Sequence, residues 1–261
     1  HSIRRRQRQM CIRDSAIELV AVVFMLVSAT NFGLHFLSFT KRSFRYYLAN
    51  DEFKFFLLII LVTVVVSFAT LYIKEGFTIE NALRYGVFQT ISIITTTGFT
   101  LEPLTAMGNS VGFLIFVVAF IGACSGSVGG GMKVWRVLLM LKVGFSNMTK
   151  VIHPSAVNSV KLNGEKIVSS QIEAVFAFIA IYITFFLFFL FVLVFQDVDF
   201  YSAFSGTAAA INNLGPGLGE LSENYSGLTD VGKISLTLAM IVGRLELFGV
   251  LILMVPSFWK N

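Results

Sequence analysis

The stretch "IITTTGFTLEP", Ile93 to Pro103, places three threonines and a glycine between two long apolar stretches. It is too polar for a helix that faces lipid. Irregular backbone at membrane depth is tolerated only where it is buried in protein or lines water. Carbonyl oxygens exposed there can replace the hydration shell of an ion. The chemistry that this stretch predicts is coordination of a dehydrated monovalent cation, and the residues that return in extended form are Thr96, Thr97, Gly98 and Phe99.

A second glycine turn, "NNLGPG" (Asn212 to Gly217), lies at a matching position further along the chain. A shift of 117 residues lays Gly98 on Gly215 and Phe55–Ile73 on Ile172–Leu190. Repeats of this length are typical of transporters and channels. The alternative is that both turns are ordinary connecting loops between crossings. Their equivalent positions in the two repeats weigh against it.

Each glycine turn follows a short amphipathic segment, Tyr85–Thr95 or Tyr201–Ile211. Eleven helical residues extend about 16 Å, which is half a membrane. We therefore predict re-entrant half-helices whose carboxyl ends, with their partial negative charge, point to the membrane centre and favour a cation there.

The composition requires a membrane around these segments. The chain is 56% hydrophobic and 13% charged, whereas soluble domains carry about 25% charged residues. Since roughly 20 apolar residues cross a bilayer, we predict crossings at Ala16–Phe39, Phe55–Ile73, Ala174–Phe195 and Ile234–Val255. A fifth crossing, Val111–Ala123 resumed by Val134–Val143, is predicted to be broken in its middle.

Loop charges orient these crossings. Lys41–Lys54 and Lys133–Lys166 are basic, whereas Gln196–Val231 holds five acidic residues and no basic one. Basic loops stay in the cytoplasm, so the acidic loop faces outside, where its carboxylates either concentrate cations or are simply solvated. Residues 1–15 supply most of the net charge of +5, which excludes a nucleic-acid footprint along the chain.

Residues 1–15 are interpreted as a non-native or truncation-edge segment. A signal peptide is the alternative, but Ala16–Phe39 is too long for its apolar core. Cys11 and Cys124 are in such different settings that a disulfide framework is not expected.

The stretch "GACSGSVGGGMK", Gly122 to Lys133, resembles a phosphate-binding loop in its glycine spacing. That interpretation fails because Met132 intrudes before the lysine, no Ser or Thr follows it, and no strand precedes it. We interpret the stretch as a flexible interruption of a crossing, in a water-filled cavity beneath the glycine turns.

Arg244 is predicted near mid-bilayer, where a charge costs roughly 2.5–3.5 kcal/mol and marks a functional candidate. Glu246 lies two positions on and does not share its helix face. Arg244 is expected to face the cavity and donate to carbonyls of the interruption. The alternative is a buried ion pair between repeats.

Four motifs in order carry a family resemblance: "TTTGFT", "GACSGSVGGGMKVWRVLLMLK", "AINNLGPGLG" and "GRLELFGVLILMVPSFWK". They resemble the third and fourth repeats of Trk-type potassium uptake membrane subunits, a family grouped with the Ktr and plant HKT transporters. The resemblance implies an all-α polytopic membrane protein of the bacterial inner membrane. Its helix–re-entrant pore loop–helix repeats, four in the family, are related to potassium channels and surround one potassium pathway. This chain lacks the first repeat and most of the second.

The resemblance also implies roles for particular residues. The selectivity-filter positions are Thr96, Thr97, Gly98 and Phe99, with Asn212, Asn213, Leu214 and Gly215 opposite. The interruption becomes an intramembrane gate, which Arg244 helps to hold shut. The gate positions are Gly122, Cys124, Ser125, Gly126, Ser127, Gly129, Gly130, Gly131 and Arg244. No cofactor is expected besides the transported K⁺. The expected partners are the lipid bilayer, a second copy in a homodimer, and a cytoplasmic nucleotide-binding regulatory subunit.

The predicted organisation follows the repeats. It comprises the edge segment 1–15, the last helix of the second repeat at 16–42, the third repeat at 54–143, a basic cytoplasmic loop at 144–167 and the fourth repeat at 168–261. The predicted function is potassium uptake, incomplete in this piece. The alternatives are a sodium-coupled secondary transporter with a broken-helix substrate site, and a membrane enzyme, for which no catalytic pairing stands out.

Overall fold

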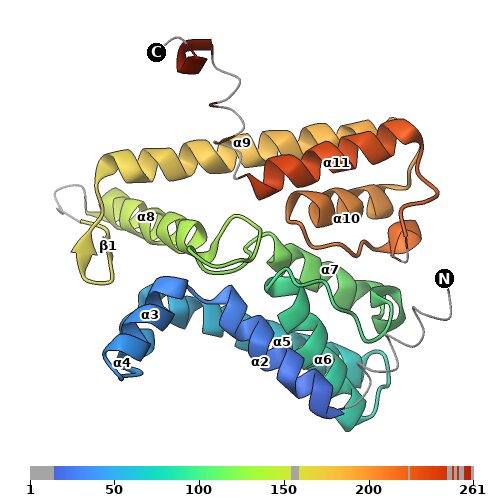
Figure 1. The fold of residues 1–261 in the computed structure, drawn as a ribbon, viewed down its shortest axis with the longest axis horizontal. Helices are drawn as coiled ribbons and strands as arrows, with labels where there is room; N and C mark the ends of the chain where they lie inside the picture. The colour runs from blue at the N-terminus through green and yellow to red at the C-terminus, as the bar shows by residue number, and fades with distance from the viewer. Residues whose placement is uncertain are drawn as a thin grey trace.

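Helices make up nearly all of the fold in the computed structural model, which describes residues 15–153, 159–222, 224–245, 249, 252 and 256–259 (Figure 1). The longer helices are α2 (Ser15–Ala29), α3 (Phe32–Thr40), α5 (Asp51–Ile73), α6 (Ile79–Ile94), α7 (Asn109–Ala119), α8 (Val134–Ile152), α9 (Ser169–Val194), α10 (Phe200–Ile211) and α11 (Asp230–Arg244). Short elements complete the set: α4 (Arg45–Ala49), 3₁₀ turns at Leu104–Met107, Gly219–Leu221 and Pro256–Trp259, and a hairpin of β1 (Lys161–Leu162) and β2 (Glu165–Lys166).

Two of the predicted crossings correspond to α5 and α9, the helices that are long and apolar enough to span a membrane among the described residues. Asn50 caps α5 by accepting a hydrogen bond from the Phe53 amide, 2.9 Å away. The outward face of α9 exposes Leu187, Phe188 and Phe191, which suits contact with lipid tails. The last predicted crossing lies partly outside the described residues, as do residues 1–14, Glu223 and Glu246.

The segment predicted as one crossing, Ala16–Phe39, is not a straight helix: α2 and α3 meet at 97°, as in a broken span or a re-entrant loop. The sequence "SATNFG" explains the break. Thr30 bonds back to the Leu26 carbonyl at 2.8 Å, an interaction that bends helices. Asn31 then caps α3 by accepting from the Gly33 amide at 2.7 Å. The domain predicted at 16–42 therefore contains two helices rather than one.

The helix before the first glycine turn is longer than predicted. Thr78 caps α6, and Glu80 in its first turn complements the helix dipole, so the helix begins six residues before Tyr85. Its 16 residues extend about 24 Å, short of the about 30 Å of a bilayer core. The helix before the second turn, α10, has 12 residues and nearly the predicted bounds.

The predicted cytoplasmic loop 144–167 contains regular structure. Helix α8 continues to Ile152, nine residues beyond the predicted end. Strands β1 and β2 then pair around an Asn163–Gly164 turn with φ of 52° and 84°, the conformation that Asn-Gly favours in tight hairpins. Leu162 is buried against Leu138 and Val175, which fixes the hairpin on α8 and α9.

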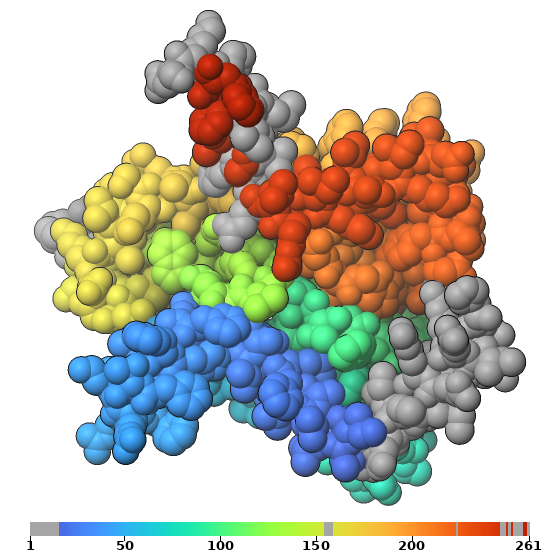
Figure 2. Space-filling view, in the orientation of Figure 1, coloured from blue at the N-terminus to red at the C-terminus, as the bar shows by residue number. Residues whose placement is uncertain are grey.

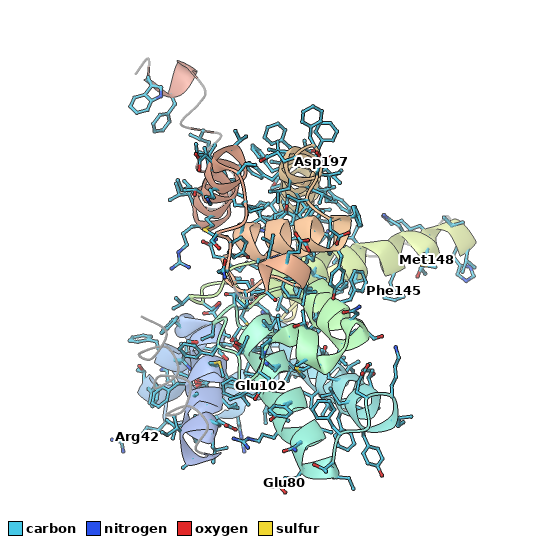
Figure 3. The ribbon with its side chains drawn as sticks, turned by 90° about the vertical axis from the view of Figure 1, so that its right-hand side faces the viewer. Arg42, Glu80, Glu102, Phe145, Met148 and Asp197 are labelled. Atoms are coloured by element: carbon cyan, nitrogen blue, oxygen red, sulfur yellow. The ribbon has the colours of Figure 1, made fainter. Side chains whose placement is uncertain are left out.

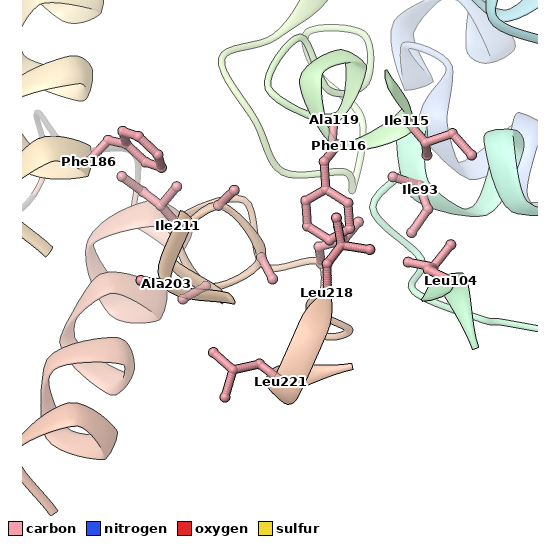
Figure 4. Close-up of a cluster of buried hydrophobic side chains, with 14 of the residues drawn as sticks. Ile93, Leu104, Ile115, Phe116, Ala119, Phe186, Ala203, Ile211, Leu218 and Leu221 are labelled. Carbon is pink, nitrogen blue, oxygen red and sulfur yellow. The ribbon is translucent and has the colours of Figure 1, made fainter. Parts of the chain in front are cut away.

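The helices form two groups with a shared core. Helices α2, α5 and α6 lie together in the lower half of Figure 1 and α9, α10 and α11 in the upper half, with α7 and α8 between them (Figure 1). Figure 2 shows the two groups in contact along the same line. Side chains of α7, such as Phe116 and Ala119, lie between Ile93 of α6 and Ile211 of α10 (Figure 4). This apolar cluster fixes the ends of α6 and α10 relative to each other.

Candidate ion-binding site and the loop beside it

The first glycine turn begins where α6 ends in a Schellman motif. The Thr96 amide donates to the Ile93 carbonyl at 3.0 Å, and the Thr97 amide donates to the Ser92 carbonyl at 2.9 Å. Thr96 is left-handed, with φ of 54°. A β-branched residue in that conformation is an outlier, and such strain costs of order 1–3 kcal/mol. The surrounding contacts must therefore hold Thr96 in place.

The second glycine turn repeats this geometry 117 residues later. The Asn213 amide donates to the Ala210 carbonyl at 3.0 Å, and the Leu214 amide donates to the Ala209 carbonyl at 2.8 Å. Asn213 has φ of 55°, one degree from that of Thr96. The chain therefore uses one backbone design twice, each time at the carboxyl end of a short helix, where the partial charge is negative.

The two turns meet. A Cβ added to Gly98 would collide with the carbonyl oxygen of Leu214, and it would lie 3.2 Å from Cδ of Pro216. Gly98 also has φ of 76°, which favours glycine. The fold thus brings Gly98 of the first turn next to Leu214 and Pro216 of the second.

A side-chain hydroxyl donates a hydrogen bond to a backbone carbonyl in each of the two turns. Ser92 Oγ donates to the Phe99 carbonyl at 2.6 Å, and Tyr225 Oη donates to the Gly215 carbonyl at 2.8 Å. Burial raises the pKa of Tyr225 to about 12, so its hydroxyl stays a donor at neutral pH. The carbonyls of Phe99 and Gly215 therefore each already accept one hydrogen bond from a side chain.

The side chain of Asn212 is held by the neighbouring span. Tyr182 of α9 donates its hydroxyl to Asn212 Oδ1 at 2.7 Å, and both residues are buried. This bond, together with the Schellman contacts, positions the start of the second turn. The Asn212 backbone carbonyl faces the neighbouring loop, since a Cβ on Gly130 would collide with it.

The segment predicted as a broken crossing contains α7, an interruption loop (Gly122–Lys133) and α8. The base of this interruption loop is closed, because the Met132 amide donates to the Phe120 carbonyl and the Val134 amide to the Ala123 carbonyl, both at 3.0 Å. At this base a Cβ on Gly131 would lie 2.7 Å from Cα of Gly122. The two glycines therefore allow the backbone at the start of the loop to contact the backbone at its end.

The interruption loop is attached to the break between α2 and α3. The Cys124 amide donates to the Ala29 carbonyl at 3.0 Å, and the Phe32 amide donates to the Gly126 carbonyl at 3.1 Å. The bend in α2 thus leaves backbone groups that the loop satisfies. The predicted gate position Cys124 is buried among Met25 and Ala29, which fits a packing role.

Glu52 is a site residue that the sequence analysis missed. It lies in the first turn of α5 and is buried, and its carboxylate accepts a hydrogen bond of 2.5 Å from the Ser125 amide. It also accepts from the Trp135 backbone. One carboxylate therefore holds both sides of the interruption loop. The signal available in the sequence was an acidic residue three positions before the long charge-free run that begins at Phe55.

Two cations lie against the same loop. Arg244 Nη1 donates to the Val128 carbonyl at 3.2 Å, a contact of the kind predicted. Lys133, which the sequence analysis considered only as part of a phosphate loop, is buried and donates its ammonium to the Gly129 carbonyl. Both side chains line a cavity of about 170 Å³ together with Gly129, Gly130 and Gly243.

A hydroxyl joins the first glycine turn to the interruption loop. The Gly130 amide donates to Thr96 Oγ1 at 2.7 Å. We expect Thr96→Val to leave this amide without an acceptor, at a cost of about 1–3 kcal/mol, while keeping the β-branched shape. In the full-length parent, hydrogen exchange of amides 126–131 should then accelerate by roughly five- to 150-fold.

Thr96→Ser is the matched control, because it keeps the hydroxyl. Exchange in residues 126–131 should stay close to that of the unsubstituted protein. Equal protection in the Val and Ser variants would contradict the role of this hydrogen bond.

The fold contains apolar helices that suit a membrane and two copies of a short helix followed by a polar glycine turn. A polar loop lies beside the point where the two turns meet. These features define a helical membrane protein of a transport class. The chain belongs to the TrkH family: the family model, described as a cation transport protein, matches residues 12–261.

The chain is similar to several members of this family. It is 38% identical to the Trk system potassium uptake protein TrkH of Halomonas elongata, over 95% of this chain and 52% of that protein. It is 32% identical to the Trk system potassium uptake protein TrkG of Escherichia coli, over 94% of this chain and 50% of that protein. The crystal structure of the potassium transporter TrkH from Vibrio parahaemolyticus superposes with a TM-score of 0.88 at 39% identity, over 94% of this chain and 53% of that one. The chain thus spans about half the length of the relatives it matches.

Proposed function

We propose that the full-length parent of this chain takes up potassium across the bacterial inner membrane, and that this chain supplies two of four walls around one pathway. The contact between Gly98 and the Leu214 carbonyl carries this proposal. It puts two carbonyl-rich turns side by side, each at the negative end of a short helix. The names of the similar relatives, which are potassium uptake proteins, support the choice of ion.

In this mechanism, backbone carbonyls of the two turns replace water around a dehydrated K⁺ ion. The ion ligands are drawn from Thr96, Thr97, Gly98 and Phe99, and from Asn212, Asn213, Leu214 and Gly215. The side-chain bonds from Ser92 and Tyr225 keep the turns rigid, so that the cavity does not collapse onto a smaller ion.

The interruption loop acts as the gate in this proposal. Its contacts with Asn212 on one side and with Arg244 on the other support this role, because they keep the loop next to the second glycine turn. Lys133 and Arg244 bring positive charge to the same point, which opposes the passage of a cation until the loop moves.

A basic surface at one end of the molecule suggests where a regulatory partner binds. The β1–β2 hairpin and the end of α8 present Lys150, Lys161 and Lys166, all exposed, on the side that the positive-inside rule assigns to the cytoplasm. We propose this face as the contact for a nucleotide-binding regulatory subunit, with the parent acting as a homodimer in the bilayer.

The test is ion flux in liposomes that contain the purified full-length parent. We expect uptake of K⁺ or ⁸⁶Rb⁺ down a gradient, with Na⁺ entering at least several-fold more slowly. A matched set of protein-free liposomes sets the background. Accumulation of an organic solute driven by a Na⁺ gradient, with no K⁺ flux, would replace this proposal by a sodium-coupled transporter.

A further inference from the structure

A large apolar pocket lies away from the glycine turns, between the bent pair α2–α3 and the helices α4 and α5. Its volume is about 830 Å³, within the range of about 300–1,000 Å³ that is usual for ligand sites. Its walls are mainly hydrocarbon, with five phenylalanine rings, from Phe32, Phe39, Phe44, Phe53 and Phe56.

The polar side chains in the pocket wall are already bonded to the protein. Nε2 of His35 lies 2.8 Å from the Val27 carbonyl, and because a carbonyl only accepts, this nitrogen carries the proton. Nδ1 lies 2.6 Å from the Tyr47 hydroxyl, so the second ring nitrogen is also hydrogen-bonded within the protein. Thr30 is bonded to Leu26. The pocket therefore offers little to a polar solute and suits a hydrocarbon chain.

Three cations stand beside this pocket. Lys41, Arg42 and Arg45 lie on the turn that joins α3 to α4, and all three are exposed. None of them forms an ion pair within the part of the chain that the structure describes. Nearby Asp51 is bonded to Lys142 instead. Arg42 lies at the edge of the molecule, away from the helices (Figure 3).

The bend places both features at a membrane surface. Because α3 turns 97° from α2, it runs along the surface when the axis of α2 lies along the bilayer normal. Aromatic side chains exposed at this level, including Phe36, Phe44 and Tyr46, are typical of the interface. The same end of the molecule carries the basic loops, and the leaflet on that side is the one in which polybasic segments bind anionic lipids.

We propose that this pocket binds an anionic phospholipid, with an acyl chain between α2, α3 and α5 and the phosphate held by Lys41, Arg42 and Arg45. The charge of the turn complements the phosphate, and the satisfied polar groups of the pocket complement the acyl chain. This inference depends on the membrane location of the chain and not on which ion passes through it.

The test uses the full-length parent, titrated with phosphatidylglycerol or phosphatidylcholine of the same acyl composition and followed by native mass spectrometry. At about fivefold per cation, we expect phosphatidylglycerol to bind roughly a hundredfold more tightly. The triple variant Lys41→Gln, Arg42→Gln, Arg45→Gln should lose that preference. Leu57→Trp, which fills the pocket, should weaken binding of both lipids and leave their ratio unchanged.

A matched triple variant, Lys150→Gln, Lys161→Gln, Lys166→Gln, removes the same charge elsewhere on the basic end and should keep the preference. Equal binding of the two lipids by the unsubstituted protein would overturn the proposal. So would displacement of phosphatidylglycerol by inorganic phosphate alone, because the acyl chain would then contribute nothing. Unchanged lipid binding with a lowered melting temperature in Leu57→Trp would show that another part of the parent fills the pocket.

Discussion

Replacing Gly98 by alanine should lower potassium uptake by the full-length parent by at least about tenfold. Two physical effects combine at this position: φ is 76°, and the added Cβ would collide with the Leu214 carbonyl oxygen. To relieve the collision, the two turns must separate, which moves a proposed ion ligand. A loss of only about 1.4 kcal/mol in ion binding is already tenfold in affinity. Uptake of ⁸⁶Rb⁺ by cells that lack other potassium uptake systems measures this effect.

Two other glycines separate backbone strain from the collision. Gly215 and Gly76 have φ of 103° and 70°, but a Cβ at either would have no atom within 4 Å. Gly76→Ala carries the strain outside the turns and should leave uptake close to normal. Gly215→Ala carries it inside a turn and should cause a smaller loss than Gly98→Ala. Equal losses in all three variants would assign the effect to general misfolding, and normal uptake in Gly98→Ala would remove the basis for the proposed filter.

Arg244→Ala should raise the basal flux of the parent in the absence of any regulatory subunit. The guanidinium donates to the Val128 carbonyl and lines the cavity beside the interruption loop. A unit charge about 8–15 Å from a cation raises its energy by roughly 1–2 kcal/mol at an effective dielectric constant of about 20. Removing it should therefore increase flux roughly five- to thirtyfold, measured as ⁸⁶Rb⁺ entry into liposomes.

Two variants serve as controls for Arg244. Arg244→Lys keeps the charge but not the planar guanidinium group. A low basal flux in this variant would assign the effect to the charge, and a raised basal flux would assign it to the hydrogen bond. Lys233→Ala removes an exposed cation from the same helix and should leave basal flux unchanged. A basal flux in Arg244→Ala at or below that of the unsubstituted protein would rule out the gating role.

Much of the fold follows from patterns in the sequence. Charge-free apolar runs locate α5 and α9, and the offset of 117 residues places Gly98 and Gly215 at equivalent points. The break after Ala29 was missed because the residues of "SATNFG" are not charged, and a count of apolar residues passes over them. The early start of α6 was missed because its first turn is polar, so only the capping role of Thr78 marks it.

The candidate site was less accessible from the sequence, because long-range contacts decide it. The residue types of the two turns predicted carbonyl coordination, but the contact of Gly98 with Leu214 depends on how α7 packs between α6 and α10. Glu52 and Lys133 carried no spacing pattern that would link them to the interruption loop. Their roles rest on hydrogen bonds with backbone groups: Glu52 accepts from Ser125 and Trp135, which are distant in sequence, and Lys133 donates to Gly129 within an irregular loop.

Two adjacent carboxylates at the start of α5 tie different parts of the molecule to one helix. Asp51 accepts from Lys142 and from the Asn163 amide, which fastens the β1–β2 hairpin. Glu52, the next residue, fastens the interruption loop through Ser125. A single peptide bond therefore separates the two attachments. A partner that displaced the hairpin would therefore be expected to act, through the first turn of α5, on the loop beside the glycine turns.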